Sequence, residues 1–515
     1  MPNATLFASP RRIPVRTLIA VATAAMLTAC ANIRPVPLEA QDLQPVNASD
    51  RSAMLQEVVP LSGALTLEEA QARALKYNLE RRAKLMEEAL ALRQLDVTHL
   101  DMLPKLVAQA GYGWRNNDRI SQSRNAENGD LSPSRFISQE RTHALGDLTL
   151  SWSLLDYGLG RVAAHQQADR VLIAGERRRK AMHVLMQDVR IAYWRAASAQ
   201  KLRDDVARTI TMAEEALDDS RKAETERLRN PIDALRYQRQ VLENLRLLEA
   251  INQELASANI ELGALINAPI GATIRIADVE QTLTSPRTLE MDIGAMEELA
   301  LQQNADLREH HYNSRVAREE VRRTLVRLFP NISLNYGYKY DSDRYLVHND
   351  WQEAGVQLSF NLFNLITAET QMKLARAGVA LADQRRVAAQ MAVVTQVHLA
   401  RLQLINAHKQ FQRADAIYLT DQKITEHTRN REQALAQSKL DRVGNEVATI
   451  LSMLRRYQAL AQMQAAESRL LASIGAEPAI GSTDELSLPE LVAQIKSGSE
   501  SAPRLQPTPS LKVGS

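Results

Sequence analysis

The sequence predicts a mainly α-helical protein with transmembrane β-strands, built by internal duplication of one unit. The duplication is visible in Leu75-x-x-Asn78, which recurs 226 positions later as Leu301-x-x-Asn304. Two short segments of alternating apolar and polar residues occur in each copy, and long spans without proline separate them. Strand periodicity and helix periodicity therefore follow each other in the same order in both halves.

The alternating segments predict one β-hairpin in each copy, over residues 104–156 and 330–364. Each alternating segment has about the 9 to 11 residues of a tilted transmembrane strand, with one apolar and one polar face. Pro104 and Pro330 precede the first strand of each hairpin. Because proline ends a helix and favours extended chain, these two residues mark the helix-to-strand transitions.

Aromatic residues are concentrated around these two hairpins: the stretches 103–158 and 329–363 hold 13 of the 22 in the chain. Transmembrane barrels carry aromatic girdles at both membrane interfaces, and these would produce the enrichment. The core of a soluble β-hairpin domain would produce it as well, so that alternative stays open.

Long helices are predicted between the hairpins, with boundaries near 66–102, 161–229 and 231–266, then 292–328, 368–434 and 438–474. The span 161–229 contains no proline and would be on the order of 100 Å long as a helix. Val241, Leu245 and Leu248 have coiled-coil spacing. The two shorter helices of a copy together match the long one, so we expect them to stack end to end beside it.

The amino terminus predicts export and lipid attachment. Arginines at positions 11, 12 and 16 precede a short apolar stretch that ends at Cys30, so residues 1–29 read as a signal peptide. This start resembles a bacterial lipoprotein signal, which implies cleavage before Cys30 and a covalent lipid on that residue. Cys30 is the only cysteine, which excludes an internal disulfide. An ordinary signal peptide with an incidental cysteine is the alternative.

These signals divide the chain into six parts. After the signal peptide come a lipid-attached tether (30–55), a first repeat (56–270), an equatorial linker (271–291) and a second repeat (292–476). The C-terminal tail (477–515) is predicted to be largely disordered, with a weakly helical patch over 486–495.

Four strands cannot close a barrel, and an open sheet edge in lipid would leave backbone groups without partners. Three copies would supply about 12 strands, enough for one barrel with a lumen. The sequence thus predicts a homotrimer in which a 12-stranded β-barrel continues into a long α-helical barrel.

Composition and motifs exclude several other functions. The net charge of +2 gives no general attraction to nucleic acid. No phosphate-binding loop, nucleophile motif or metal-ligand spacing occurs, so we predict no enzyme activity, no metal and no cofactor beyond the lipid on Cys30.

From about residue 55 to 476 the chain resembles the TolC-type outer-membrane efflux proteins, specifically their lipid-anchored branch. The resemblance is carried by the paired Leu-x-x-Asn motifs, the two proline transitions and Leu154-Leu155-Asp156-Tyr157-Gly158. The second copy of the last motif, Leu362-Phe363-Asn364-Leu365-Ile366, lacks its Asp and Gly. The resemblance implies a trimeric channel in the outer membrane, with a long periplasmic extension. It also implies work with a periplasmic membrane-fusion adaptor and an inner-membrane pump of RND or ABC type, in efflux or type I secretion.

The turns between long and return helices hold the one set of residues with possible chemistry. Asp233 follows Asn230-Pro231, and Asp441 occupies the equivalent place after Ser438, a pattern typical of a helix start. By resemblance these aspartates would constrict the periplasmic end of the channel. Gln437 and Arg442 flank the second turn and are candidate gate partners.

A different class of protein shares several of these features. A periplasmic coiled-coil lipoprotein, acting as a scaffold or adaptor without a pore, would have the same lipid signal and heptads. It would need no paired, aromatic-rich alternating segments.

Overall fold

The computed structural model describes residues 37–226, 231–269, 271–277, 287–433, 439–476 and 485–500, and divides the chain into two compact units. The first unit, Met1–Glu57, contains helix α2 (Ala40–Met54) within its described part. The carboxylate of Asp42 accepts a hydrogen bond from the main-chain nitrogen of Glu39 (3.0 Å) at the start of this helix. The predicted tether is therefore helical over these residues.

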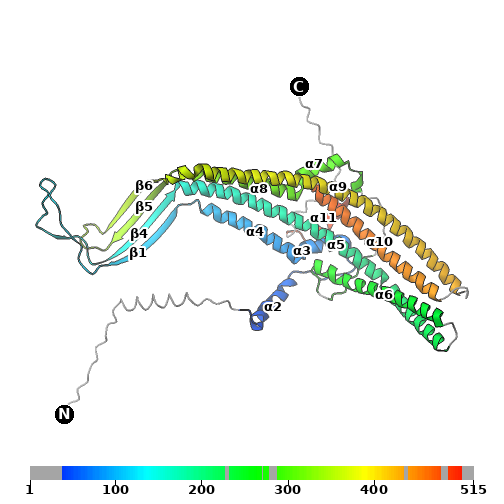
Figure 1. The fold of residues 1–515 in the computed structure, drawn as a ribbon. Coiled ribbons are helices and arrows are strands. Elements are labelled where there is room, and N and C mark those ends of the chain that lie inside the picture. The colour runs from blue at the N-terminus through cyan, green and yellow to red at the C-terminus, as the bar shows by residue number, and fades with distance from the viewer. Residues whose placement is uncertain are drawn as a thin grey trace, which may run out of the picture. The chain divides into compact units, whose positions relative to one another are not determined.

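The second unit, Val58–Ser515, contains the duplicated fold that the sequence predicts, mainly helical with four strands in one sheet (Figure 1). The first copy consists of α3 (Leu67–Tyr77), α4 (Leu79–Leu100), β1 (Lys105–Trp114), β4 (Thr142–Ser153), α5 (Leu154–Thr225) and α6 (Pro231–Leu265). The second consists of α7 (Ile293–Gln303), α8 (Ala305–Val326), β5 (Asn331–Asp341), β6 (Asp350–Ser359), α9 (Phe363–Gln433) and α10 (Lys439–Ile474).

Asn78 divides the first predicted helix, 66–102, into α3 and α4, so the prediction of one continuous helix was wrong. The side-chain oxygen of Asn78 accepts a hydrogen bond from the main-chain nitrogen of Arg81 (3.0 Å) and thereby caps α4. The side-chain nitrogen donates to the carbonyl of Leu265 (3.1 Å) at the end of α6. One side chain thus starts a helix and ties it to the end of the return helix.

Asn304 does the same in the second copy, where the predicted helix 292–328 is divided into α7 and α8. Its side chain accepts from the main-chain nitrogen of Leu307 (3.1 Å) and donates to the carbonyl of Ser473 (2.9 Å) near the end of α10. The repeated Leu-x-x-Asn motif therefore marks a joint between three helices in each copy.

The long helix α5 begins at Leu154, seven residues before the predicted start. The hydroxyl of Ser153 accepts from the main-chain nitrogen of Asp156 (3.0 Å) and caps the helix directly after β4. Glycines in the first turns let α5 approach its neighbours: a Cβ on Gly158 would lie 3.2 Å from Val326 of α8, and one on Gly160 would lie 2.7 Å from Met102. In the second copy α9 begins at Phe363, also earlier than predicted.

The sheet has the strand order β1-β4-β5-β6, with every neighbouring pair antiparallel. Leu106 lies opposite Leu150 in the first hairpin, and Ile332 lies opposite Leu358 at the equivalent place in the second. The loop between β1 and β4 carries a second small sheet formed by β2 (Ile120–Ser121) and β3 (Phe136–Ile137).

The helices next to the sheet follow the strand order, with contacts from α4 to α5, α5 to α8 and α8 to α9. Beyond the asparagine joints, α5 packs instead against α6 and α10, and α10 packs against α9. The long helices therefore pass through both regions, while the shorter helices exchange at the joints (Figure 1).

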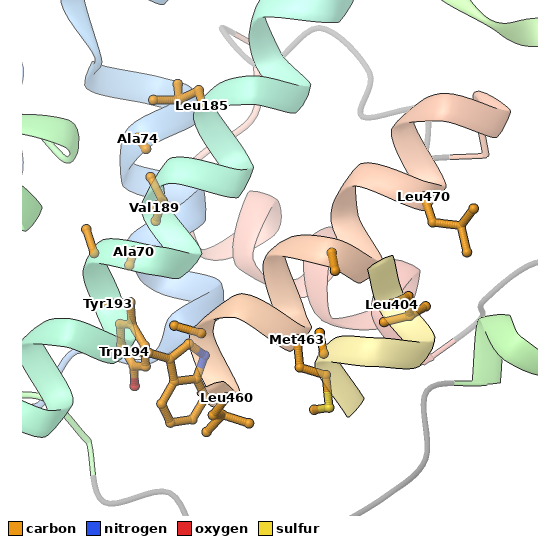
Figure 2. Close-up of a cluster of buried hydrophobic side chains, with 14 of the residues drawn as sticks. Ala70, Ala74, Leu185, Val189, Tyr193, Trp194, Leu404, Leu460, Met463 and Leu470 are labelled. Carbon is orange, nitrogen blue, oxygen red and sulfur yellow. The ribbon is translucent and has the colours of Figure 1, made fainter. Parts of the chain in front are cut away.

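The main hydrophobic core lies where α3, α5, α7, α9 and α10 meet (Figure 2). Tyr193 and Trp194 of α5 are buried there and their rings pack edge to face, 5.5 Å apart. The inter-repeat linker joins this core at Ile276, whose main-chain N–H and C=O both hydrogen-bond the side-chain amide of Gln200 (2.7 and 2.9 Å). A second core forms between α5, α6 and α10, and it buries the predicted coiled-coil residues Val241, Leu245 and Leu248.

The weakly helical patch predicted over 486–495 is part of a helix, α11 (Leu488–Glu500), which continues past the predicted end. Leu491 and Ile495 of α11 are buried against Leu75 of α3 and Met186 of α5. Within the described ranges, no helix combines the length and apolar character needed to cross a membrane.

Candidate assembly edges and helix turn

The sheet ends in two edge strands, since β1 and β6 each have one strand neighbour in the described structure. An edge strand presents a row of backbone donors and acceptors that can pair with another chain. The apolar faces of all four strands lie on the same side of the sheet, because the register places Leu106, Leu150, Tyr336 and Ala354 in one row. Large apolar side chains of this face are exposed in the single chain: Tyr112, Leu148, Leu150, Leu334, Tyr336, Tyr338, Val356 and Leu358.

Charged and polar side chains pair with one another on the opposite face of the sheet. Lys339 of β5 forms an ion pair with Glu353 of β6 (2.7 Å), and the hydroxyl of Thr149 donates to the carboxylate of Asp147. The sheet thus has one face suited to lipid and one suited to water.

Each edge strand continues into a helix that also carries an exposed apolar face. On α4, which leads into β1, exposed apolar residues recur at helical spacing: Leu79, Met86, Leu90, Val97 and Leu100. On α9, which follows β6, they are Phe363, Ile366, Leu374, Leu381 and Met391. Exposed apolar faces of this extent mark surfaces that are covered in an assembly.

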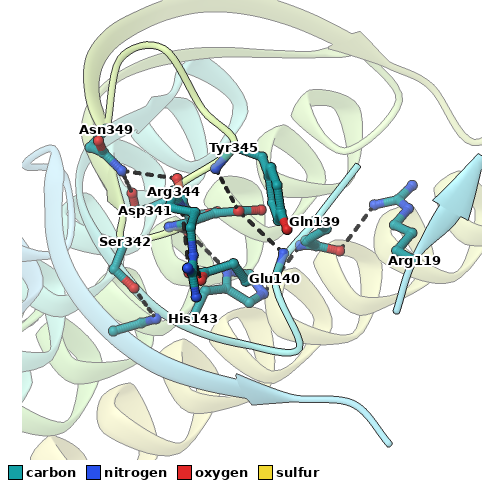
Figure 3. A network of polar contacts seen from close by, with 11 residues as sticks. Arg119, Gln139, Glu140, His143, Asp341, Ser342, Arg344, Tyr345 and Asn349 are labelled. Atoms are coloured by element: carbon teal, nitrogen blue, oxygen red, sulfur yellow. Dashed lines mark hydrogen bonds and ion pairs between the residues drawn. The ribbon is translucent and has the colours of Figure 1, made fainter. Parts of the chain in front are cut away.

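The two loops at the far end of the sheet are joined by buried carboxylates (Figure 3). Asp341 bonds the ring of His143 (2.8 Å), and Asp343, only 3 % exposed, accepts from the main-chain nitrogens of Glu140 (3.2 Å) and Tyr345 (3.1 Å). These contacts fix the end of the longer first loop against the second loop. No motif in the sequence predicts this network.

Asp233 lies in the first turn of α6, and its carboxylate is exposed. This carboxylate lies 3.9 Å from the guanidinium of Arg236, with which it forms a weak surface pair. Asp441 lies in the first turn of α10, but its side chain falls outside the described part of the structure, as does Gln437. Arg442 forms an ion pair with Glu446 (3.1 Å), which also faces Arg429 of α9 (3.5 Å). Arg442 is thus placed beside a contact between α9 and α10.

The remaining predicted positions are placed as follows. Pro104 and Pro330 each stand immediately before the first residue of a strand, β1 and β5. Cys30 lies outside the described residues. Within those residues, no three His, Cys, Asp or Glu side chains gather as metal ligands.

A run of basic residues in α5 links this helix to both of its neighbours near the sheet. Arg178 pairs with Glu88 of α4 (2.7 Å), while Arg177 pairs with Glu309 of α8 (2.7 Å). Lys180, two residues after Arg178, pairs with Asp306 of α8 (2.8 Å). Ionic contacts in both directions hold α4, α5 and α8 in one layer.

His183, one helical turn further along α5, predicts a pH-dependent stability. Its burial, together with the nearby charge of Arg179, lowers its pKa to about 4. In the unfolded chain the His183 side chain takes up a proton near pH 6.5, whereas in the folded chain it does so only near pH 4. We therefore expect the free energy of unfolding to decrease by about 3 kcal/mol as the pH falls from 6.5 to 4, because of His183.

Urea unfolding at several pH values checks this expectation. A His183→Gln variant should lose that part of the pH dependence, while His427→Gln, at an exposed position on α9, should keep it. Identical pH profiles for the His183 variant and the wild type would contradict the assignment.

Comparison with known proteins identifies related folds. No protein-family model and no curated protein matches the sequence. A structure of CusC, concerned with folding and transmembrane channel formation, superposes with a TM-score of 0.60 at 16 % identity, covering 81 % of this chain and 95 % of that one. The Campylobacter jejuni CmeC outer membrane channel gives a TM-score of 0.59 at 12 % identity, with 92 % and 98 % coverage. The open state of the Neisseria gonorrhoeae MtrE outer membrane channel gives 0.58 at 16 % identity, with 79 % and 88 % coverage.

Each superposition covers most of this chain and nearly all of the solved structure, although few residues are identical. Agreement of this kind is evidence about fold. The protein therefore has the TolC-type fold that the duplicated sequence pattern predicts, shared with outer-membrane channels.

Proposed function

We propose that this protein is the outer-membrane channel of a tripartite efflux or type I secretion system, through which substrates pass passively from a periplasmic pump and adaptor to the exterior. One observation carries the proposal: each side of the chain ends in an edge strand that continues into an exposed apolar helix face. On one side these are β1 and α4, and on the other β6 and α9. A further copy of the same chain would cover both sides.

Closure of three copies into a homotrimer would satisfy both sides at once. Twelve strands would then form one barrel, with the exposed apolar face toward lipid and the face of Lys339 and Glu353 toward the lumen. No backbone edge would remain in the membrane, where an unpaired group costs several kcal/mol. The helices would close below the barrel in the same threefold arrangement.

The other parts of the proposal concern anchoring and partners. A lipid on Cys30 would attach the N-terminal unit to the periplasmic leaflet of the outer membrane. The turns at Asp233 and Asp441 lie at the ends of the helices remote from the sheet, and would meet a membrane-fusion adaptor there. Energy would come from an inner-membrane pump of RND or ABC type.

The test compares two neighbouring positions of β6 that lie on opposite faces of the sheet. Val356 belongs to the apolar face and Gln357 to the polar face. An arginine on the lipid-facing side costs about 2 to 4 kcal/mol at the membrane midplane. Val356→Arg should therefore reduce the amount of trimer in outer-membrane fractions and the conductance recovered in planar bilayers, whereas Gln357→Arg should retain both.

The competing function is a periplasmic coiled-coil scaffold or adaptor without a pore. A scaffold would tolerate both arginine variants equally, would stay soluble once its lipid was removed, and would conduct no ions. Equal behaviour of the two variants together with absence of conductance would overturn the channel.

A further inference from the structure

The duplicated sheet determines which residues meet where one copy joins the next. We propose that β6 of one copy pairs antiparallel with β1 of a second copy in a single register, with Val356 opposite Tyr112 and Leu358 opposite Ala110. The partner is thus another molecule of this chain. The proposal rests on the trimeric barrel of the proposed function and specifies its seam.

The first step is that the two hairpins are the same structure. In β1 and β4, Leu106 lies opposite Leu150. A shift of 226 positions in the first strand and 208 in the second converts this pair into Ile332 opposite Leu358, which is the pairing found in β5 and β6. The same two shifts convert every residue pair between β1 and β4 into a residue pair between β5 and β6.

The second step is that the chain already contains one junction between two hairpins. In the β4–β5 junction, Leu148 lies opposite Tyr338. The same shifts carry Leu148 to Val356 and Tyr338 to Tyr112. If all six hairpins of a closed barrel are joined alike, the β6–β1 seam repeats the β4–β5 junction.

The backbone hydrogen bonds agree with this register. The main-chain nitrogen of Arg115 donates to the carbonyl of Arg141 (2.8 Å), so odd-numbered residues of β1 direct their backbone groups to β4. The nitrogen of Asp341 donates to the carbonyl of Asn349 (2.8 Å), so odd-numbered residues of β6 direct theirs to β5. Even-numbered residues on both edges therefore face outward, and the proposed pairs join even to even.

The side chains agree as well. Val356 and Tyr112 are 75 % and 73 % exposed in the single chain, and both belong to the apolar face. On the polar face the same register sets Glu353 opposite Arg115, two unlike charges. A slip of one residue would turn the apolar face of one copy toward the polar face of the next. Only slips of two residues compete with the proposed register.

Cysteine cross-linking in outer membranes distinguishes these registers, because Cys30 is the only native cysteine. Directly opposite residues of antiparallel strands have Cα atoms about 4.5 to 5.5 Å apart, within the range of a disulfide. Val356→Cys with Tyr112→Cys should give covalent dimers and trimers on oxidation. The two slipped pairs, Val356→Cys with Ala110→Cys and Val356→Cys with Trp114→Cys, should give about tenfold less.

A pair inside the chain serves as the positive control for strand geometry. Leu148→Cys with Tyr338→Cys should form an intramolecular disulfide and no covalent oligomer. If a slipped pair cross-links better than Val356 with Tyr112, the register is wrong while the trimeric barrel stands. The proposed channel itself is overturned if three results occur together: the control pair reacts, no seam pair reacts in any register, and the protein runs as a monomer.

Discussion

Replacing Asn78 and Asn304 together with alanine is expected to lower the free energy of unfolding by about 4 to 8 kcal/mol. Each replacement removes a helix cap, worth about 1 kcal/mol, and leaves the carbonyl of Leu265 or Ser473 without its donor, at a cost of about 1 to 3 kcal/mol. The hydrogen bonds of the two asparagine side chains have no partner in common, so their effects should add. Urea unfolding of the purified protein measures the change.

Two further variants separate the roles of the asparagine side chain. Asn78→Asp keeps an oxygen that can cap α4 but loses the donor to Leu265, so about 1 to 3 kcal/mol of the single-site loss should remain. Asn252→Ala, at an exposed position in the middle of α6, should change stability by less than about 0.5 kcal/mol. A double alanine variant as stable as wild type would show that packing alone holds the joints.

The strands could be predicted because alternation is a local signal. The duplication could be predicted because the same local patterns recur in both halves of the chain. Alternation along a strand follows directly from the side-chain period of two, and the exposed face of this sheet is recorded residue by residue. The predicted end of the first hairpin was less accurate. Because Ser153 caps α5, residues 154–156 are the start of that helix and not the end of the strand. A serine hydroxyl in such a place has no periodic signature.

The joints and the outer network could not be predicted because their partners are distant in sequence. Asn78 bonds a carbonyl 187 residues away, and the surrounding residues contain no glycine or proline to indicate a break. Asp341 and His143 are likewise 198 positions apart. Helix α11 was predicted only as a weakly helical patch, since a helix of 13 residues is marginal alone and here depends on packing against Leu75 and Met186.

Replacing Asp233 and Asp441 with asparagine is expected to weaken the block of the proposed channel by divalent cations by about tenfold. Asp233 is 67 % exposed at the start of α6, and its weak pair with Arg236 leaves its charge available. In a threefold assembly, the two positions would bring six carboxylates to the end of the pore, and carboxylate oxygens are the ligands that hard divalent cations prefer. Asparagine keeps the size of the side chain and removes the charge, so conductance should rise at the same time.

Asp218→Asn is the matched control for this prediction. Asp218 on α5 is 69 % exposed and also pairs weakly with an arginine three residues on, Arg221 at 3.6 Å, but it lies inside a helix rather than at a turn. It should therefore leave both block and conductance unchanged. If the Asp233 and Asp441 variants alter stability by the 0.3 to 1 kcal/mol typical of a carboxylate at a helix start, and leave block unchanged in planar bilayers, the aspartates act only on their helices. Because block depends on charge in the pore and stability depends on the helix dipole, the two measurements separate a gate from a helix cap.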